Sequence, residues 1–253
     1  HNRVTGGAIG FPKAVLRRQL DFLYNTHTYG SPILGFKKGD VTVSASRLFF
    51  GYALGTNLLF PFRVGATVAL FPEKPTPERI LEEVTRRKAT HLVSVPTMIN
   101  AMVQFEPEPG RYDWSSLRIT TSAGEALPPP LLEKYTLKYG HEILDGIGSA
   151  ELVHVYITNR PGDVVPGSLG KVVEGYEAKV CDDEGREVPD GELGSLWIRG
   201  ESMGLGYFRR TAETRKSFRG EWFVSADKFR RDSEGRFWYG GRTDDLLKVG
   251  GRF

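Results

Sequence analysis

Residues 5–15 read TGGAIGFPKAV and bring glycines and prolines close to one lysine, Lys13. Glycine lets the backbone turn its amides toward an anion, and a lysine beyond the glycines can approach the same charge. These residue types could therefore hold a phosphate. The segment departs from the Walker pattern, because Pro12 replaces the glycine before the lysine and Ala14 replaces the hydroxyl residue after it. Taken alone, its pattern is that of a glycine turn.

A second candidate site lies in residues 145–151, whose sequence DGIGSAE ends an apolar run. We expect this run to be a strand, so the segment would lie at the carboxyl edge of a sheet, where open α/β folds bind ligands. Asp227 and the segment GEALP at 124–128 also follow predicted strands. Each has a structural alternative: Asp227 as a surface carboxylate, and 124–128 as a loop that leads into a helix.

The elements that must position these residues follow from the apolar pattern. Five runs have the length and β-branched content of strands: 41–46, 66–71, 91–96, 117–124 and 142–148. Helix candidates lie between them at 76–88, 97–105 and 128–140. The first carries Thr76 as a candidate N-cap and Pro77 at its first position. This alternation predicts an α/β fold with a mostly parallel sheet flanked by helices.

The pattern changes after residue 159. Closely spaced glycines and short apolar runs, such as 191–200 and 236–241, predict a small antiparallel, β-barrel-like subdomain with one helix at 211–218. We therefore expect an incomplete α/β subdomain at 1–159, a β-rich subdomain at 160–240 and a hinge segment at 241–253.

Composition narrows the function classes. The 253 residues are 40% hydrophobic and 26% charged, values typical of a globular protein, and the formal net charge is +3. Basic doublets are scattered among acids, so we expect no nucleic-acid partner. The most apolar stretch, 48–71, contains Asn57 and Arg63, so we expect no membrane span. A single cysteine, Cys181, predicts a reducing, cytoplasmic location. The oligomeric state stays open.

Several segments occur in the order and spacing of one large family: SAGEALPPPLLEKY at 122–135, DGIGSAELVH at 145–154, GSLGKVVEGYEAKVCDDEGREVPDGELGSLWIRG at 167–200, GEWFVSAD at 220–227 and GGRTDDLLKVGG at 240–251. With them the chain resembles the adenylate-forming acyl-CoA synthetases. SASRLFFGYALG at 44–55 and SAELVHVYITNRPGDV at 149–164 resemble the benzoate-CoA ligase branch of aryl-CoA ligases. The resemblance implies that an acid and ATP give acyl-AMP and pyrophosphate, after which coenzyme A displaces AMP.

For the nucleotide, the resemblance implies that residues 5–13 form a mobile phosphate loop and that Lys13 meets the phosphates. Glu151 would hold Mg²⁺ on the phosphates, because a hard carboxylate suits a hard cation. Asp227 would accept both ribose hydroxyls, and Arg242 would support the ribose and phosphate end. The remaining implied nucleotide residues belong to the phosphate loop or the walls around the adenine: Thr5, Gly7, Gly10, Gly124, Glu125, Ala126, Asp145, Gly146, Ile147, Gly148 and Ser149.

For the acid, the resemblance implies that Tyr52 borders an aryl ring and that His154 lies near the carboxylate. Ala53 and Val93 would flank the ring, so a small aromatic carboxylic acid is the expected substrate. A tyrosine or histidine on an apolar stretch is more often a core residue, which is the alternative for Tyr52 and His154. Asp244 matches the hinge about which the family's C-terminal domain turns.

The chain departs from the family pattern where phosphate would bind. The family loop reads Ser-Gly-Thr-Thr-Gly where this chain has residues 6–10, GGAIG, and Ala150 stands where threonine is usual. If each hydroxyl contributes about 0.5–1.5 kcal/mol, losing several weakens ATP binding by roughly one to three decades. The residues Val224, Ser225 and Ala226 also replace the usual Arg-Thr-Gly before Asp227.

Both ends of the chain predict an internal part of a longer protein. The resemblance implies a preceding segment and a following domain that carries the adenylation lysine and much of the coenzyme A tunnel, so we expect the isolated chain to be inactive or nearly so. Two other functions remain open. One is a different acyl-adenylating enzyme, for a fatty acid or a carrier-protein thiol. The other is a decayed, non-catalytic nucleotide-binding homologue.

Overall fold

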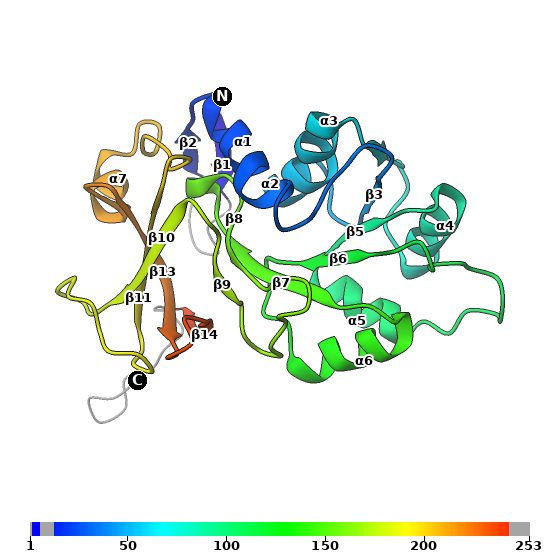
Figure 1. The fold of residues 1–253 in the computed structure, drawn as a ribbon. Helices are drawn as coiled ribbons and strands as arrows, with labels where there is room; N and C mark the ends of the chain where they lie inside the picture. Colours follow the sequence, from blue (N-terminus) through cyan, green and yellow to red (C-terminus); the bar gives the residue numbers. More distant parts are fainter. Residues whose placement is uncertain (1, 6–12, 243–253) are drawn as a thin grey trace.

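The computed structural model describes residues 2–5 and 13–242. A seven-stranded sheet flanked by helices lies beside a five-stranded antiparallel sheet (Figure 1). A short antiparallel pair, β1 (Asn2–Thr5) and β2 (Lys13–Leu16), places the backbone of Thr5 opposite Lys13. The predicted α/β class with a following antiparallel unit is confirmed.

The larger sheet has the order β4-β3-β5-β6-β7-β8-β9, in which β3 to β7 run parallel and the last two joins are antiparallel. Its strands are β3 (Val41–Ser44), β4 (Thr67–Ala69), β5 (His91–Ser94), β6 (Ile119–Ser122), β7 (Ile143–Gly148), β8 (Val155–Thr158) and β9 (Lys171–Val172). The five predicted runs therefore form β3 to β7. β8 returns beside β7, so the carboxyl end of β7 opens into a tight reversal that carries residues 149–154.

Helices cover both faces of this sheet (Figure 1). On one face, α4 (Pro77–Arg87), α5 (Pro96–Gln104) and α6 (Pro129–Tyr139) share an apolar core with β3 and β5. On the other lie α1 (Leu20–Asn25), α2 (Gly51–Leu54) and α3 (Phe60–Val64), with π-helical turns at Thr26–Gly30 and Gly55–Leu59. In the part of the chain that the structure describes, no helix is long and apolar enough to cross a bilayer.

The second sheet has the order β10-β11-β13-β12, and β14 pairs with β13. Its strands are β10 (Tyr176–Cys181), β11 (Gly194–Gly200), β12 (Phe218–Arg219), β13 (Trp222–Arg231) and β14 (Phe237–Arg242), and α7 (Thr211–Ser217) precedes β12. One buried core contains residues of both sheets, from Leu144 and Tyr156 to Leu196 and Phe229. The boundary between two subdomains near residue 160 stays a prediction.

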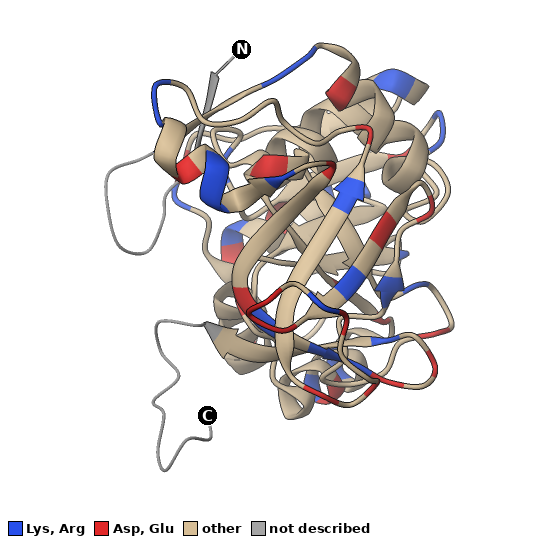
Figure 2. Ribbon diagram, turned by 90° about the vertical axis from the view of Figure 1, so that its left-hand side faces the viewer, with Lys and Arg blue, Asp and Glu red and all other residues tan. Residues whose placement is uncertain are grey.

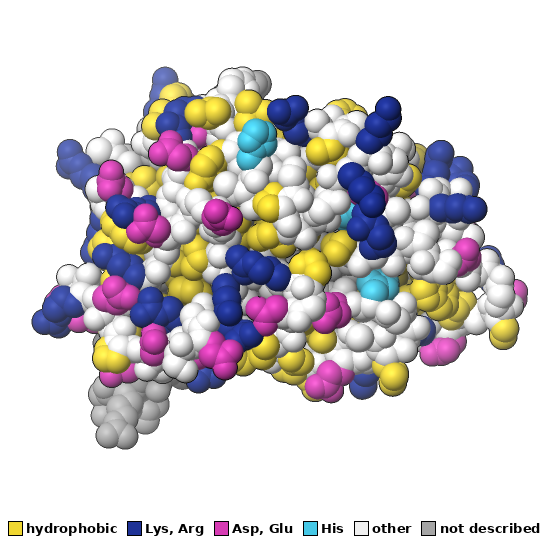
Figure 3. Space-filling model, viewed as in Figure 1, with side chains coloured by type: hydrophobic (Ala, Val, Ile, Leu, Met, Phe, Trp, Pro, Cys, Tyr) yellow, Lys and Arg dark blue, Asp and Glu magenta, His cyan; other side chains and the backbone are white. Residues whose placement is uncertain are grey.

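Charged side chains of both signs are interspersed over the surface. Figure 2 shows this for the face formed by the second sheet, and Figure 3 shows it for the face seen in Figure 1. Many are paired, as in the contacts of Arg199 with Glu177 and Glu221. Such exposed pairs contribute little stability, so the fold depends on the two apolar cores.

The start of α4 follows the sequence prediction. Thr76 has an extended backbone, and its Oγ1 accepts a hydrogen bond from the amide of Arg79 at 3.2 Å. The helix ends at Arg87, and the next residue, Lys88, has a left-handed backbone. The cap supplies a partner for an amide that the first turn leaves without one.

We expect Thr76→Ala to lower the free energy of unfolding by about 1 kcal/mol, because this cap hydrogen bond is lost. Thr76→Ser keeps the hydroxyl and should stay close to wild type. Urea denaturation followed by circular dichroism measures both. Equal midpoints for the alanine and serine variants would contradict the role of the cap.

Candidate functional site

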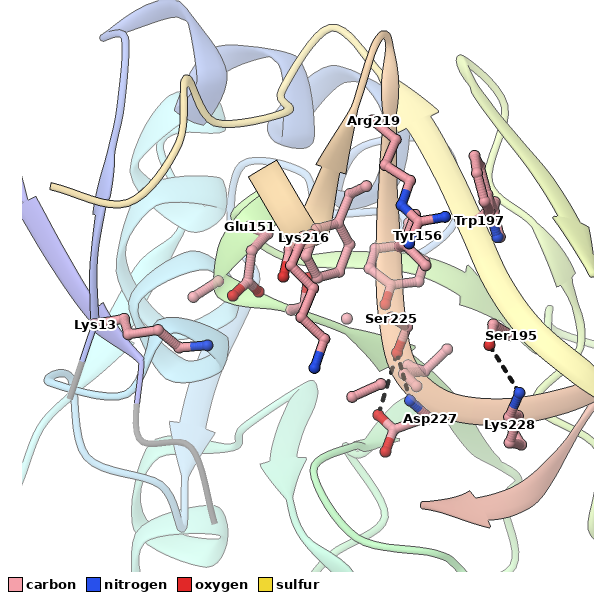
Figure 4. A pocket seen from close by; sticks show the side chains of 18 of the residues that line it. Lys13, Glu151, Tyr156, Ser195, Trp197, Lys216, Arg219, Ser225, Asp227 and Lys228 are labelled. Carbon is pink, nitrogen blue, oxygen red and sulfur yellow. Dashed lines mark hydrogen bonds between the residues drawn. The ribbon is translucent and has the colours of Figure 1, made fainter. Parts of the chain in front are cut away.

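Three charged side chains predicted to meet a nucleotide line one cleft of about 520 Å³ (Figure 4). Lys13 begins β2, Glu151 lies in the 3-10 turn Ala150–Leu152 that follows β7, and Asp227 lies in β13. The cleft is also lined by Ile147, Gly148, Ser149 and Ala150. Segments far apart in the sequence therefore converge where both sheets meet.

The carboxylate of Glu151 is buried and held by a tyrosine. The hydroxyl of Tyr207 donates to its Oε1 at 2.6 Å, and Glu151 is 7% exposed. Burial, together with the neighbouring carboxylate, raises the pKa of Tyr207, so this hydroxyl keeps its proton and remains a donor. The ammonium of Lys13 lies over the ring of the same tyrosine, 4.5 Å from its centroid. Tyr207 thus touches both charged groups.

A sharp reversal between β7 and β8 places Glu151. Val153 has φ 75° and ψ −54°, the strained geometry of a tight three-residue turn. The carbonyl of Leu152 accepts a hydrogen bond from Ser202 Oγ at 2.9 Å, and the guanidinium of buried Arg17 donates to the carbonyl of Ser202 at 2.6 Å. A Cβ on Gly148 would lie 2.4 Å from the carbonyl oxygen of His154, so the close strand return requires glycine there.

Asp227 is oriented by its own strand. Its backbone amide donates to Ser225 Oγ at 3.0 Å, and that hydroxyl lies 3.4 Å from Asp227 Oδ2 (Figure 4). The next residue, Lys228, donates to Asp183 Oδ1 at 3.2 Å and to Ser195 Oγ at 3.0 Å. The backbone of Arg242 pairs with Asp227 between β13 and β14. Ser225, one of the departures from the family pattern, therefore contacts the aspartate.

Most of the residues predicted to surround adenine line a smaller cavity of about 280 Å³. It is lined by Gly124, Glu125, Ala126, Gly146, Ile147, Gly148, Leu169, Asp227 and Tyr239. Ile147, Gly148 and Asp227 line the larger cleft as well, so the two spaces adjoin. The carboxylate of Glu125 is held against the start of α5. Its Oε2 accepts hydrogen bonds from the amide and hydroxyl of Thr97 at 3.1 and 2.6 Å.

Asp145 lies deeper, at the centre of β7. Its carboxyl group is buried beside a third cavity of about 230 Å³, to which Ala126 and Tyr239 also contribute. Burial raises the pKa of Asp145 to about 7, against hydrogen bonds that lower it. Its backbone carbonyl accepts hydrogen bonds from the amide and side chain of Asn159 at 2.9 and 3.2 Å. Near neutral pH this carboxyl group is therefore partly protonated.

The residues predicted to contact the acid also lie together. The hydroxyl of Tyr52 donates to Thr121 Oγ1, and Thr121 pairs with Val93 between β5 and β6. His154 Nε2 lies 2.9 Å from the backbone carbonyl of Tyr52, and their rings stack with centroids 5.5 Å apart. Burial raises the pKa of Tyr52. Ala53, beside Tyr52, is fully buried.

Some predicted site residues lie outside the described part of the chain: Gly7, Gly10, Asp244 and the side chains of Thr5 and Arg242. The structure adds residues that sequence analysis missed, chiefly Tyr207 and Lys216 of the larger cleft. Tyr207 stands in GLGYFRR and Lys216 in TAETRKSF, segments whose residue types carry no specific chemical signal. Only the fold brings them to the cleft that Glu151 lines.

The chain is similar to known proteins over most of its length. Residues 4–208 match the AMP-binding enzyme family. A benzoate-CoA ligase of Thauera aromatica is 40% identical over 98% of this chain and 47% of its own length. An anthranilate-CoA ligase of Pseudomonas aeruginosa is 36% identical, with the same coverage of 98% and 47%. The chain thus spans about half the length of the curated relatives it matches.

Solved structures give the same result. An anthranilate CoA ligase in complex with anthranoyl-AMP superposes with a TM-score of 0.94 at 40% identity, over 99% of this chain and 48% of that one. A benzoate CoA ligase from Burkholderia xenovorans has a TM-score of 0.88 at 41% identity, over 94% and 48% of the two chains. From the match to residues 4–208 and these likenesses, the chain belongs to the AMP-binding enzyme family.

Proposed function

We propose that the protein containing this chain is an ATP-dependent aryl-acid:CoA ligase of the benzoate-CoA ligase type. The observation that carries the proposal is the convergence of Lys13, Glu151 and Asp227 on one cleft. That cleft adjoins the cavity of the predicted adenine residues. Relatives named as aryl-CoA ligases support the substrate class. The one cysteine, buried Cys181, agrees with the cytoplasmic location that we also propose.

In this proposal the nucleotide spans the two adjoining spaces. Adenine lies in the smaller cavity between Ala126 and Ile147, and the ribose hydroxyls bond to the carboxylate of Asp227. The phosphates then extend into the larger cleft toward Glu151 and Lys13. This order matches the lining residues, since Asp227 belongs to both spaces while Lys13 and Glu151 belong to the larger one.

A small aromatic acid would lie beside Tyr52 and His154, with Ala53 and Val93 as apolar neighbours. His154 is buried and its ring stacks on that of Tyr52, so the half-buried Tyr52 ring would contact the aryl group while His154 supports it. Only Leu152 and Val153 separate His154 from Glu151 in the sequence. In this proposal one short turn carries both the residue near the acid carboxylate and the residue near the phosphates. This placement would bring the carboxylate close to the α-phosphate.

The proposed reaction has two steps. A carboxylate oxygen of the acid attacks the α-phosphorus, a new P–O bond forms, and pyrophosphate leaves with the electron pair of the broken bond. The thiolate of coenzyme A then attacks the acyl carbon, and AMP leaves with the electron pair of the acyl–oxygen bond. Lys13 would stabilise negative charge on the phosphates during the first step.

The donor set fits Mg²⁺ bound together with ATP. Among the side chains that the structure describes, no three His, Cys, Asp or Glu residues gather as a metal site. Mg²⁺ usually keeps several waters and binds through one or two carboxylates plus substrate phosphates. Glu151 would hold the ion through its carboxylate, which also accepts the hydrogen bond from Tyr207. When bound, the ion neutralises phosphate charge.

We expect Glu151→Gln in the complete gene product to lower the rate of pyrophosphate release with benzoate roughly 100-fold, because the charge is lost while size is kept. Glu174→Gln, at an exposed residue outside the cleft, is the matched control and should keep the wild-type rate. Pyrophosphate-coupled assays measure both.

Three results of this assay would each count against a part of the proposal. Equal rates for the Glu151 and Glu174 variants would exclude the assigned role of Glu151. Background release by wild type, persisting after hydroxyl residues are restored at positions 6, 8 and 9, would favour the non-catalytic homologue. Turnover of fatty acids in preference to benzoate would favour the other acyl-adenylating enzyme.

We expect Tyr52→Ala to change acid preference about tenfold, measured as the ratio of kcat/KM for benzoate to that for a ring-substituted benzoate, because a pocket wall is removed. The KM for ATP should change little. Tyr112→Ala, at a tyrosine that packs against Phe105, is the control. An unchanged ratio in the Tyr52 variant would refute the pocket assignment.

The raised pKa of the buried Asp145 carboxyl group can be tested through the pH dependence of stability. Its pKa is about 7 in the fold and ordinarily 3.8, so the folded protein holds a proton that the unfolded chain has lost. Its contribution to the free energy of unfolding therefore falls as pH rises from about 4 to about 7 and then levels off. Asn cannot ionise, so Asp145→Asn should become more stable relative to wild type by about 1–3 kcal/mol across this range.

Asp163→Asn is the control, because the pKa of Asp163 shifts in the opposite direction. A hydrogen bond from Arg236 lowers the pKa of Asp163, so its ionised form favours the folded state. This contribution is lost only below about pH 4, so the stability difference between Asp163→Asn and wild type should stay nearly constant between pH 4.5 and 7.5. Urea denaturation at pH 4.5 and 7.5 compares both variants with wild type. A pH-independent difference between Asp145→Asn and wild type would contradict the buried acid.

A further inference from the structure

We propose that Lys216 is a second phosphate-binding cation of this cleft and that its ammonium contacts the α-phosphate. The inference rests on the proposed function, because it concerns how the same cleft binds ATP. It adds a residue from α7, an element that neither the sequence pattern nor the family resemblance connects with the nucleotide.

The position of Lys216 supports this contact. Lys216 lines the larger cleft, and Figure 4 shows its ammonium pointing into the space between Lys13 and Asp227. If Asp227 holds the ribose and Lys13 the far phosphates, the α-phosphate lies between them. A lysine entering there meets the phosphate at which the acid reacts.

Helix α7 is tied to the residue that holds Glu151. The amide of Tyr207 donates to Thr214 Oγ1 at 2.9 Å, and the same hydroxyl donates to the carbonyl of Arg210 at 2.9 Å. Phe218, just after the helix, packs edge-on against the Tyr207 ring with centroids 5.3 Å apart. Lys216 lies between these two anchors. The helix therefore presents Lys216 at a defined place relative to Glu151.

The ion pairs of the cleft leave the ammonium of Lys216 available to bind an anion. Four cationic residues line it: Lys13, Lys216, Arg219 and Lys228. Lys228 is 5% exposed and pairs with Asp183, and the guanidinium of Arg219 lies over the Trp197 ring, 5.6 Å from its centroid. Among the ion pairs between described side chains, none includes Lys216. An anion in the cleft can pair with Lys216 without breaking an existing ion pair.

The chain also has a need for such a cation. Residues 6–10, GGAIG, offer no side-chain hydroxyl to a phosphate, and Ala150 presents a methyl group to the cleft beside Glu151. A hydrogen bond from an ammonium to phosphate is stronger than one from a neutral hydroxyl. Lys216, which lies on the β-rich side of the cleft, would thus donate to phosphate where residues 6–10 and Ala150 offer no side-chain donor.

The experiment compares three variants of the complete gene product: Lys216→Ala, Lys216→Arg and, as matched control, Arg215→Ala. Arg215 is exposed on the same helix and does not line the cleft. Isothermal titration with adenosine, AMP and a non-hydrolysable ATP analogue, in the presence of Mg²⁺, separates base and sugar binding from phosphate binding. Pyrophosphate release with benzoate is measured in parallel.

We expect Lys216→Ala to weaken binding of both AMP and the ATP analogue about tenfold, because a charge-assisted hydrogen bond to the α-phosphate is lost. Adenosine affinity should be unchanged, Lys216→Arg should recover most of the loss, and Arg215→Ala should match wild type. Pyrophosphate release should fall in Lys216→Ala even at saturating ATP, since charge grows at this phosphate during the reaction.

Equal AMP affinity in Lys216→Ala and Arg215→Ala, with wild type binding AMP, would overturn the Lys216 assignment and leave the ligase proposal standing. A matching loss of adenosine affinity would also overturn it, because that result indicates a structural role. Failure of wild type to bind either AMP or the ATP analogue would instead overturn the proposed function, and this inference with it.

Discussion

The site depends on one hydrogen bond, from the hydroxyl of Tyr207 to the carboxylate of Glu151. A buried carboxylate without a partner carries a large desolvation penalty, so Glu151 requires a donor that stays protonated. A phenol suits this place, because it neutralises nothing and leaves the negative charge for a cation. Its ring also receives the ammonium of Lys13. One residue from the β-rich half thus sets the geometry of charges carried by two other segments.

The surrounding backbone makes that bond possible. The chain reverses at Val153, between Glu151 and His154. Ser202 Oγ donates a buried hydrogen bond to the carbonyl of Leu152 in this turn, and Arg17 in turn donates to the carbonyl of Ser202. Strained backbone of this kind persists only where its neighbours fix it. Here the fixing residues, Arg17 and Ser202, lie far from the turn and from each other in the sequence. A rigid turn therefore joins the proposed nucleotide and acid sides of the site.

Much of the architecture could be predicted from sequence. Length, β-branched runs and a capped helix start identified β3 to β7 and α4, because these signals are local. The antiparallel return of β8 beside β7 was not predicted, since strand pairing depends on contacts between distant residues. The same limit applies to the site. Glu151 and Asp227 stand in recognisable segments, whereas Tyr207 and Lys216 stand in ordinary ones and acquire their chemistry only from the fold.

The apolar core common to both sheets has a consequence for modularity. Leu144 and Tyr156 pack in the same cluster as Leu196 and Phe229, so the core between the two sheets needs both of them. Unfolding of one sheet would expose apolar surface of the other to water. Both sheets should therefore unfold on heating in a single cooperative transition. Evolution could not exchange the β-rich half for an unrelated barrel without rebuilding the interior of its neighbour.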